Sequence, residues 1–261
     1  QSEDGVHRGM DGSEALYDYI CSKILYPNLL DESNYTAALC GSGMLTDGGV
    51  RGIKNPDRAY AIERAYGASP EYIFTSAYYN TRPEQFFHFY KEEVLRYIPD
   101  PGLGSYAMAR MEQAGKLQCV ITANVFNQAI RGGCEHVINL HGTVYENQCP
   151  RCGELYTVED ILEMKGIPCC RVCNATIRPK VSLFGEMVDS RIMTRTTEEI
   201  EKAEVLLLVG TTLRSETFSN YLKYFHGKYL AVLHRTPHYS DEKADLTLIG
   251  EPGQILSQLG Y

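Results

Sequence analysis

The sequence predicts an α/β protein whose main domain is a doubly wound parallel sheet, accompanied by a smaller zinc-binding part. Two observations support this fold class. Short apolar runs rich in β-branched residues alternate with amphipathic segments, and four of the nine cysteines form two C-x2-C pairs. Strands buried on both faces occur in parallel sheets that helices cover on each side, and paired cysteines at this spacing are typical of a structural zinc site.

The apolar runs define the expected sheet. Each has the length and composition of a strand buried on both faces, with room for a helix before the next one. We expect five strands, at residues 35–40, 118–122, 136–140, 205–209 and 229–233.

The segment between the first two strands, residues 46–115, is too long for one crossover helix. It is rich in Tyr and Phe and contains five prolines. We expect it to form a helical lobe. Its clearest helix is at residues 84–96, because Pro83 suits the first turn and Phe87, Tyr90 and Val94 recur on one face.

The cysteine pairs are the most specific chemical signal in the chain. Seventeen residues separate Cys149-Pro-Arg-Cys152 from Cys170-Arg-Val-Cys173. This spacing suits a tetrahedral four-thiolate zinc site on two facing knuckles, and four thiolates leave no open position for catalysis. We therefore expect one structural zinc ion that folds its own module. Cys169 could replace Cys170 as a ligand, but the C-x2-C register makes it a spectator.

The remaining cysteines are scattered, which argues against a disulfide scaffold. Cys21, Cys40, Cys119 and Cys134 lie in apolar surroundings, where a thiol behaves as a small hydrophobic side chain. We expect all four to be buried in the core.

Charge and hydropathy exclude several function classes. The net charge of −8 disfavours general binding to nucleic acid or anionic membranes, since both require a basic surface. No stretch has the roughly 18 apolar residues of a membrane span, and residues 1–11 are polar rather than typical of a secretory signal. We expect a cytoplasmic protein with no nucleic-acid or membrane partner, and the oligomeric state stays open.

Two turns at strand ends are candidate phosphate-binding loops. Gly41-Ser42-Gly43 follows the first strand, and Gly210-Thr211-Thr212 follows the fourth. The full G-x-G-x-x-G pattern is absent, so the first turn alone is a weak signal. Because ligands bind at the carboxyl ends of parallel strands, the two turns together predict a dinucleotide site.

Taken in order and spacing, the motifs of residues 34–259 resemble those of the sirtuins, a family of NAD-dependent protein-lysine deacylases. The combination is far more specific than any one motif. The matching segments are Gly41-Ser42-Gly43, Ile121-Thr122-Ala123-Asn124, Leu140-His141-Gly142, the two cysteine pairs, Ile177-Arg178-Pro179, Phe184-Gly185-Glu186 and Val209-Gly210-Thr211-Thr212-Leu213.

The resemblance implies a Rossmann-like NAD-binding domain with a smaller domain built from a zinc-ribbon module and a helical module. On this chain the large domain would comprise residues 1–45, 103–142 and 183–261. The helical module would span residues 46–102 and the zinc module residues 143–182.

The resemblance also assigns catalytic roles. His141 would act as general base on a ribose hydroxyl, a task that suits an imidazole near neutral pH, and Asn124 would orient the ribose and a water. The acyl group of the lysine would end on ADP-ribose, with nicotinamide released. The implied NAD-binding residues are Gly41, Ser42, Gly43, Thr122, Asn124, Gly210, Thr211, Thr212 and His234.

The implied second substrate is an acyl-lysine protein or peptide. It would lie between Phe184-Gly185-Glu186 and residues 211–215 and add a strand through backbone hydrogen bonds. Val181 matches the position that packs on the lysine stem. Tyr79 and Arg82 resemble the pair that holds acidic acyl groups in one sirtuin branch, although a packed Tyr and a solvated Arg explain them as well.

The chain departs from the family pattern around nicotinamide. Where the family has a carboxylate that holds the amide, this chain has Gly52, and a Gln and an Asp are replaced by Ala123 and Phe126. Each lost polar partner of a buried amide costs about 1–3 kcal/mol. The candidates to compensate are Asp47, Lys54 and Asn127.

Three functions are therefore consistent with the sequence. The first is NAD-dependent protein-lysine deacylation by a divergent sirtuin-like enzyme, either a deacetylase or an acidic-acyl deacylase. The second keeps NAD cleavage but changes the acceptor, as in an ADP-ribosyltransferase or NAD hydrolase. The third is a catalytically weak protein that binds NAD or ADP-ribose.

Overall fold

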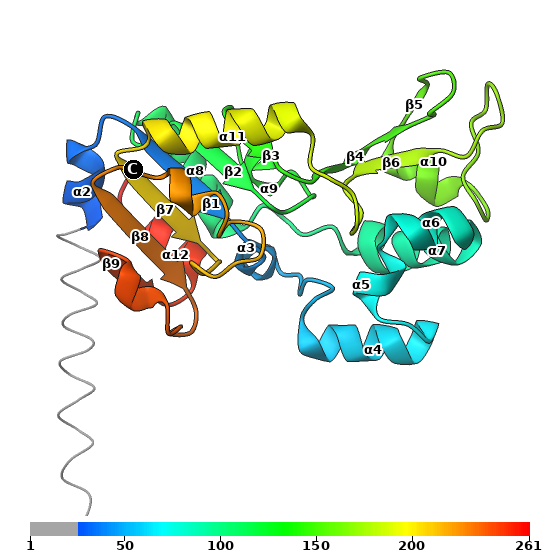
Figure 1. Ribbon diagram of the computed structural model, residues 1–261, viewed down its shortest axis with the longest axis horizontal. Helices are drawn as coiled ribbons and strands as arrows, with labels where there is room; N and C mark the ends of the chain where they lie inside the picture. The colour runs from blue at the N-terminus through cyan, green and yellow to red at the C-terminus, as the bar shows by residue number, and fades with distance from the viewer. Residues whose placement is uncertain (1–25) are drawn as a thin grey trace, which may run out of the picture.

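A six-stranded parallel sheet forms the larger part of the molecule. The computed structural model describes residues 26–261, and Figure 1 shows this sheet on the left and the smaller part on the right. The strand order is β3-β2-β1-β7-β8-β9. The strands are β1 (Thr36–Cys40), β2 (Cys119–Thr122), β3 (Val137–Asn139), β7 (Val205–Val209), β8 (Tyr229–His234) and β9 (Leu246–Ile249).

All five expected strands are present, and every pairing among them is parallel. Strand β9 was not predicted. In this edge strand buried Leu246 and Leu248 alternate with half-buried neighbours, so it forms no continuous apolar run. The order runs outward from the neighbouring strands β1 and β7 in both directions. The fold is therefore doubly wound, with its crevice at the carboxyl ends of these two strands.

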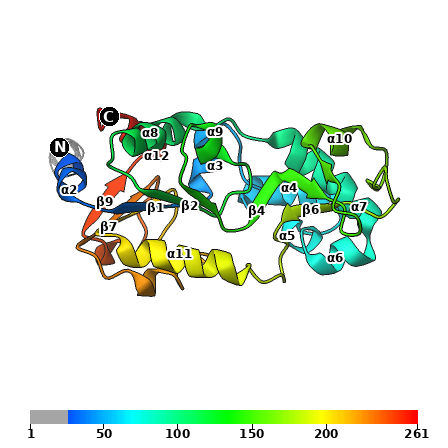
Figure 2. The same cartoon turned by 90° about the horizontal axis from the view of Figure 1, so that it is seen from above.

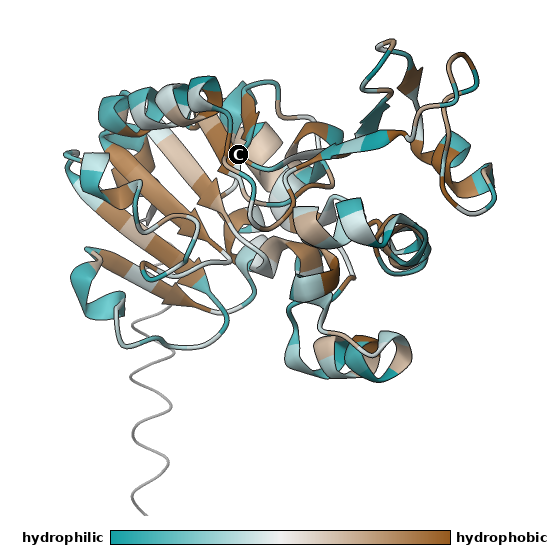
Figure 3. Ribbon diagram, turned by 45° about the vertical axis from the view of Figure 1, so that its right-hand side comes forward, coloured by the Kyte–Doolittle hydropathy of each residue, from teal (hydrophilic) through white to brown (hydrophobic). Residues whose placement is uncertain are grey.

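Helices cover both faces of the sheet, as Figure 2 shows. On one face α8 (Gly102–Gln113) and α12 (Pro252–Ser257) pack over Ala38, Leu207 and Leu233. On the other face α11 (Ser190–Lys202) contributes Ile200 to a cluster with Leu39 and Leu208. The apolar strands are the brown arrows of Figure 3. Two shorter helices, α2 (Tyr26–Glu32) and α9 (Gln128–Arg131), complete this part.

Three of the four scattered cysteines are buried, as expected. Cys40, Cys119 and Cys134 have exposed fractions of 2–3% and contact the cores on either face of the sheet. Cys21 lies outside the described residues.

Helices are the only regular elements between β1 and β2. A short α3 (Gly43–Asp47) is followed by α4 (Pro56–Tyr66), α5 (Pro70–Ile73), α6 (Ser76–Thr81) and α7 (Pro83–Phe89). The helices from α4 to α7 form the expected lobe. The expected helix begins at Pro83, but it changes to π-helix at Tyr90–Val94 and 3₁₀-helix at Leu95–Tyr97.

The π-helical turn has a clear packing role. It buries Tyr90 completely and also buries Lys91, whose ammonium donates to the backbone oxygens of Met164 and Gly166. A regular helix would distribute these side chains differently, since a π-turn inserts an extra residue into the ladder. Lys91 thereby ties the helical lobe to the cysteine-bearing segment.

The cysteine-bearing segment contains a second, antiparallel sheet of order β5-β4-β6. Its strands are β4 (Gly142–Gln148), β5 (Leu155–Tyr156) and β6 (Arg178–Val181), and α10 (Val158–Glu163) packs beside them. This sheet and the helical lobe share one core, in which Phe74, Phe86 and Tyr90 lie together. None of the helices described in residues 26–261 is long and apolar enough to cross a membrane.

Candidate functional site

A cavity of about 410 Å³ lies where the large sheet meets the smaller part. Its walls come from five groups of residues, drawn from parts of the chain that are far apart in the sequence. They are the loop after β1 (Ser42, Leu45, Val50, Gly52, Ile53 and Lys54), the helical lobe (Arg58, Phe74, Glu93 and Val94), the turn after β2 (Ala123, Asn124, Val125 and Phe126), the β3–β4 junction with the loop after β6 (His141, Ser182, Leu183, Phe184, Gly185 and Glu186), and the loop after β7 (Ser215, Glu216 and Thr217).

The two glycine turns pack directly against each other. The amide of Gly43 donates to the Gly210 oxygen at 2.9 Å, and a Cβ at Gly43 would lie 2.6 Å from the Gly210 Cα. A Cβ at Gly41 would lie 2.5 Å from the Cβ of Thr211. The glycines are therefore required by the contact between the turns, which brings Gly41, Ser42 and Gly43 beside Gly210 and Thr211.

Asn124 joins this arrangement from β2. Its side chain is buried and donates through Nδ2 to the Gly41 oxygen at 2.9 Å, and its backbone amide donates to Thr122 Oγ1 at 3.0 Å. The carboxyl ends of β1 and β2 are thus fixed to each other. Asn124 faces the cavity in a single held orientation.

His141 lines the same cavity from the junction of β3 and β4. Its backbone oxygen accepts from the Ser182 amide at 2.9 Å. Burial, and second the positive charge of Lys54, lower the pKa of the imidazole below its ordinary 6.5. His141 is therefore neutral at pH 7, the form that accepts a proton.

The segment Phe184–Glu186 forms one rim of the cavity. The amide of Phe184 donates to the Phe74 oxygen at 3.0 Å, and its oxygen accepts from the Ser76 amide at 3.2 Å. Glu186 accepts from Arg178 at 2.7 Å and from the Leu183 amide at 2.8 Å. The rim is thus held by the helical lobe and by β6.

Val181 does not line the cavity, so its expected contact with a lysine stem is not supported. Its exposed fraction is 2%, and it packs in the core shared by the helical lobe and the small sheet. Ser182 lines the cavity in its place. Successive residues of an extended chain point to opposite sides. Val181 therefore faces the core, and its neighbour Ser182 faces the cavity.

Tyr79 and Arg82 also lie away from the cavity. The Tyr79 hydroxyl donates to the Ile177 oxygen at 3.3 Å, and Arg178 stacks on its ring with the guanidinium 4.9 Å from the ring centroid. Arg82 is exposed and lies 5.6 Å from the ring centroid of Tyr78. The packed Tyr and solvated Arg therefore describe these residues better than a carboxylate-binding pair.

The departures from the family pattern cluster in this cavity. Gly52, Ala123 and Phe126 all line it. Of the three candidates to compensate, Lys54 lines the cavity, whereas Asp47 accepts from the Gly104 amide at 2.7 Å and Asn127 accepts from Asn139 at 3.0 Å.

The cavity wall also contains a charged pair that was not predicted from the sequence. Arg58 and Glu93 lie 3.7 Å apart with side-chain exposures of 16% and 23%. They come from α4 and the π-helical turn, and no local pattern links segments so far apart. The pair supplies polar groups to a part of the wall that also contains Phe74 and Val94.

His234 lies at the carboxyl end of β8, as expected, but its imidazole already has a hydrogen-bond partner within the chain. It is buried, and its Nε2 lies 3.0 Å from Asp241 Oδ2. The same Asp241 oxygen accepts from the His238 amide at 2.8 Å. The imidazole is therefore fixed by the segment between β8 and β9.

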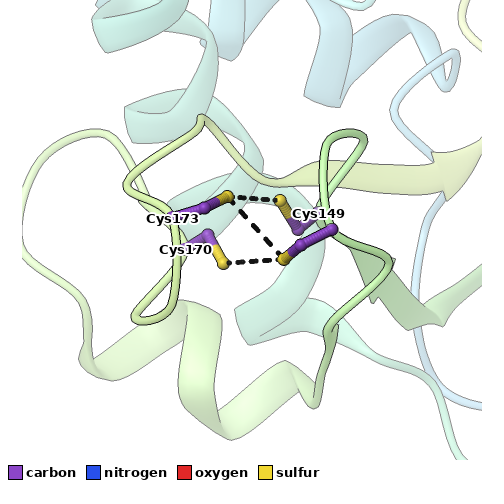
Figure 4. Close-up of side chains that lie close together, drawn as sticks. Cys149, Cys170 and Cys173 are labelled. Carbon is purple, nitrogen blue, oxygen red and sulfur yellow. Dashed lines mark hydrogen bonds between the residues drawn. The ribbon is translucent and has the colours of Figure 1, made fainter.

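The four paired cysteines converge, as the sequence predicts. Figure 4 shows their sulfurs together, with separations of 3.3 Å (Cys149–Cys173), 3.5 Å (Cys152–Cys170) and 3.7 Å (Cys152–Cys173). A tetrahedral zinc with Zn–S bonds of about 2.3 Å places its sulfurs about 3.8 Å apart, so the donor set and its spacing fit zinc. Cys169 lies outside this group.

A tyrosine supports the cluster. The Tyr156 hydroxyl donates to Cys170 Sγ at 3.2 Å and accepts from the Arg171 amide at 2.8 Å. Hydrogen bonds, first that from Tyr156 and then those from backbone amides, lower the pKa of the Cys170 thiol to about 6. This favours the thiolate form that binds a metal.

Comparison with known proteins identifies the family. A sequence profile of the Sir2 family matches residues 41–217. The chain belongs to the Sir2 family. The matched range includes the glycine turns, Asn124, His141 and all four clustered cysteines.

Two relatives and two solved structures place the chain within the Sir2 family. NAD-dependent protein deacetylases of Thermotoga maritima and Clostridium perfringens are 32% identical over 190 residues and 28% identical over 232 residues. These matches cover 71% and 88% of this chain and 75% and 95% of the relatives. A structure of Sir2 with a p53 peptide and NAD+ has a TM-score of 0.78 and 26% identity, and covers 90% of this chain and 96% of that one. A structure from work on sirtuin substrate affinity has a TM-score of 0.81 and 27% identity, and covers 91% and 97%.

The link between His141 and the small sheet can be tested at Gly142. Gly142 and Gly67 both have φ of +71°, but a Cβ at Gly142 would lie 1.9 Å from the Lys180 oxygen, whereas Gly67 has open space. We expect Gly67→Ala to cost about 1–2 kcal/mol in free energy of unfolding, the strain of a left-handed residue, and Gly142→Ala to cost clearly more. Urea unfolding of both variants measures the difference. Equal losses would show that the β4–β6 contact does not constrain this junction.

Proposed function

We propose that this Sir2-family protein is an NAD-dependent protein-lysine deacylase that transfers the acyl group to ADP-ribose and releases nicotinamide. The observation that carries the proposal is that His141 and Asn124 face one cavity, next to the paired glycine turns and the Phe184–Glu186 rim. The names of the relatives and the peptide and NAD+ in the neighbouring Sir2 structure support it.

Each residue has a task that its surroundings explain. NAD, when bound, supplies the ribose carbon that receives the acyl oxygen. In the two glycine turns the amides of Ser42, Thr211 and Thr212 suit phosphate groups at strand ends, because those of Gly41, Gly43 and Gly210 already donate to backbone oxygens. Neutral His141 accepts the proton of a ribose hydroxyl, and Asn124, fixed on Gly41, orients the ribose and a water.

The peptide would add to the rim formed by Phe184, Gly185 and Glu186. Arg178 Nη2, which donates to both carboxylate oxygens of Glu186, and the bonds of Phe184 to the helical lobe keep this rim in place. Ser182 and Leu183 then line the path from the rim to His141. In the net reaction, the nicotinamide–ribose bond and the acyl-lysine amide bond would be broken and one water consumed. Nicotinamide and the lysine amine would leave, and ADP-ribose would carry the acyl group.

The decisive experiment is mass spectrometry of the protein with NAD and a panel of acetyl-, succinyl- and longer-chain acyl-lysine peptides. We expect acyl-ADP-ribose and free lysine from the unchanged protein, and a loss of at least about a hundredfold in His141→Ala, the lower end of a general base's contribution. His136→Ala is the matched control, because His136 is an exposed histidine paired with Glu112. Products that persist in His141→Ala would contradict the assigned base.

The apolar substitutions favour a second candidate function, NAD cleavage with another acceptor or NAD binding without turnover. Gly52, Ala123 and Phe126 remove polar partners from the cavity. Nicotinamide or free ADP-ribose released without deacylation would support an ADP-ribosyltransferase or NAD hydrolase. Binding of NAD or ADP-ribose with no product would support a catalytically weak binding protein.

Phe126 allows the altered part of the cavity to be tested directly. We expect Phe126→Asp to strengthen inhibition by nicotinamide about tenfold, equivalent to about 1.4 kcal/mol, because a carboxylate can accept a hydrogen bond from the amide. Phe126→Leu controls for the change in size. Inhibition constants from the deacylation assay, or nicotinamide binding by calorimetry, measure the effect. Equal responses of the two variants would show that Phe126 lies away from the nicotinamide site.

We also propose that the cysteine cluster holds one structural zinc ion through Cys149, Cys152, Cys170 and Cys173. The ion would stabilise the fold and take no part in the reaction, because four thiolates complete its coordination. It would also hold β4 and β6, which flank His141 and the rim.

Tyr156→Phe tests the support of this cluster. Loss of the hydrogen bond to Cys170 should weaken zinc affinity by about 10–100-fold, the effect of removing a partner of a metal ligand. Tyr145→Phe, on β4, is the matched control for loss of a phenol hydroxyl. Metal analysis and competition with a zinc chelator give the affinities. Unchanged affinity in Tyr156→Phe would rule out this role.

A further inference from the structure

Lys54 places a positive charge in the wall of the cavity that His141 also lines. It belongs to the loop after β1 and reaches two other walls of the cavity at once. Its ammonium lies 4.8 Å from the ring centroid of Phe184, at the rim, and 3.5 Å from Oε2 of Glu216, in the loop after β7. A cation over an aromatic face is attracted to it, whereas an ion pair as exposed as this one contributes little.

We propose that Lys54 is an electrostatic positioning residue, which couples the entry of an anionic ligand into the cavity to the basicity of His141. The catalytic consequence rests on the proposed function, whereas the coupling itself does not. Lys54 touches Phe184 and Glu216, and it acts on His141 through its charge.

The other charged groups of the cavity are each paired. Arg58 lies 3.7 Å from Glu93, and Glu186 accepts from Arg178 at 2.7 Å. Their charges therefore largely cancel at a distance. The negative charge of Glu216 counteracts the positive charge of Lys54. Because the Glu216 side chain is 92% exposed, water and salt screen its charge and weaken this effect.

Lys54 and His141 line the same cavity, so the positive charge of Lys54 disfavours a second positive charge on the imidazole. After burial, it is the second cause that lowers the pKa of the imidazole. With Glu216 as the carboxylate contact of Lys54, the imidazole of His141 is a weaker base than that of an exposed histidine. An anionic group that pairs with Lys54 would cancel this effect and raise the pKa of His141 toward its ordinary value, so the base becomes stronger when the cavity is filled.

Lys54 is suited to such a change of partner. Its side chain is 51% exposed, and Glu216 is its only carboxylate contact among the described residues. A ligand carrying phosphate or carboxylate groups could replace Glu216 without breaking a buried pair. The diphosphate of a dinucleotide and the carboxylate of an acidic acyl group are the two sources of such a charge.

The test is an NMR titration of the histidine ring resonances in the full chain, with His141 assigned through His141→Ala. Lys54→Met should raise the pKa of His141, Lys54→Arg should leave it unchanged, and Glu216→Gln should lower it further. These opposite signs separate an electrostatic role from general damage to the fold. The difference between Lys54→Met and the unchanged protein should shrink in 1 M NaCl, where the screening length is about 3 Å.

Ligand coupling needs a second set of titrations, with inorganic pyrophosphate and with a succinyl-lysine peptide. Whichever anion pairs with Lys54 should raise the pKa of His141 in the unchanged protein and in Lys54→Arg, but not in Lys54→Met. A response to pyrophosphate alone assigns the charge to the dinucleotide, and a response to the peptide alone assigns it to the acyl group. An identical pKa of His141 in the unchanged protein and Lys54→Met, or no response to either anion, overturns the proposal.

The catalytic consequence has its own readout. The acidic limb of kcat/KM, which reports the free protein, should lie at lower pH than the acidic limb of kcat, and this gap should close in Lys54→Met. If deacylation is absent altogether, the proposed function fails while the titrations still decide whether Lys54 controls His141. If deacylation is present and the gap persists in Lys54→Met, the coupling fails alone.

Discussion

The contact between the two glycine turns is the constraint on which the site depends. Gly41 and Gly43 approach Gly210 and Thr211 so closely that no Cβ fits between them. This contact joins the carboxyl ends of the neighbouring strands β1 and β7, where the sheet reverses its order. Asn124 then bonds to the Gly41 oxygen. The sheet side of the cavity is therefore set by backbone packing, with the side-chain amide of Asn124 bonded to the same turn.

The opposite wall depends on the small sheet and the helical lobe. The cysteine cluster fixes the loops at one end of β4 and β6, and at the other end the His141 oxygen accepts from Ser182. Lys91 joins the lobe to the cysteine-bearing segment, and the ring centroids of Phe74 and Phe184 lie 6.4 Å apart at the rim. A metal in this cluster would thus influence the reaction mechanically, by holding the wall that carries His141.

Local patterns in the sequence predicted the parts of the molecule that local physics determines. The buried strands follow from continuous apolar runs, and the cysteine set follows from the spacing of two knuckles. The edge strand Leu246–Ile249 was not predicted, because it is fully buried on one face only and forms no continuous apolar run. Val181 was misplaced because one residue decides which face of a strand enters the cavity. For the same reason Ser182, which carries no motif of its own, could not be singled out.

Contacts between distant segments explain the remaining differences. Tyr79 lies against Arg178, about a hundred residues later in the chain, so its neighbour Arg82 alone could not reveal its role. Asp47, Lys54 and Asn127 were equivalent candidates by sequence position. Packing separates them, because Asp47 is bound to the start of α8 and Asn127 to Asn139, which leaves Lys54 in the cavity.

The distribution of charge in the cavity links two unusual features, the replacement of the family's carboxylates and the presence of Lys54 in the wall. An unpaired charge deep in an apolar cavity is costly, and the family's carboxylates are replaced here by Gly52 and Phe126. The charged groups that remain inside, Arg58 and Glu93, are paired with each other. Control of His141 by charge must therefore come from the rim, where Lys54 is half exposed and a ligand enters. In such a cavity the strength of the base depends on what occupies the site.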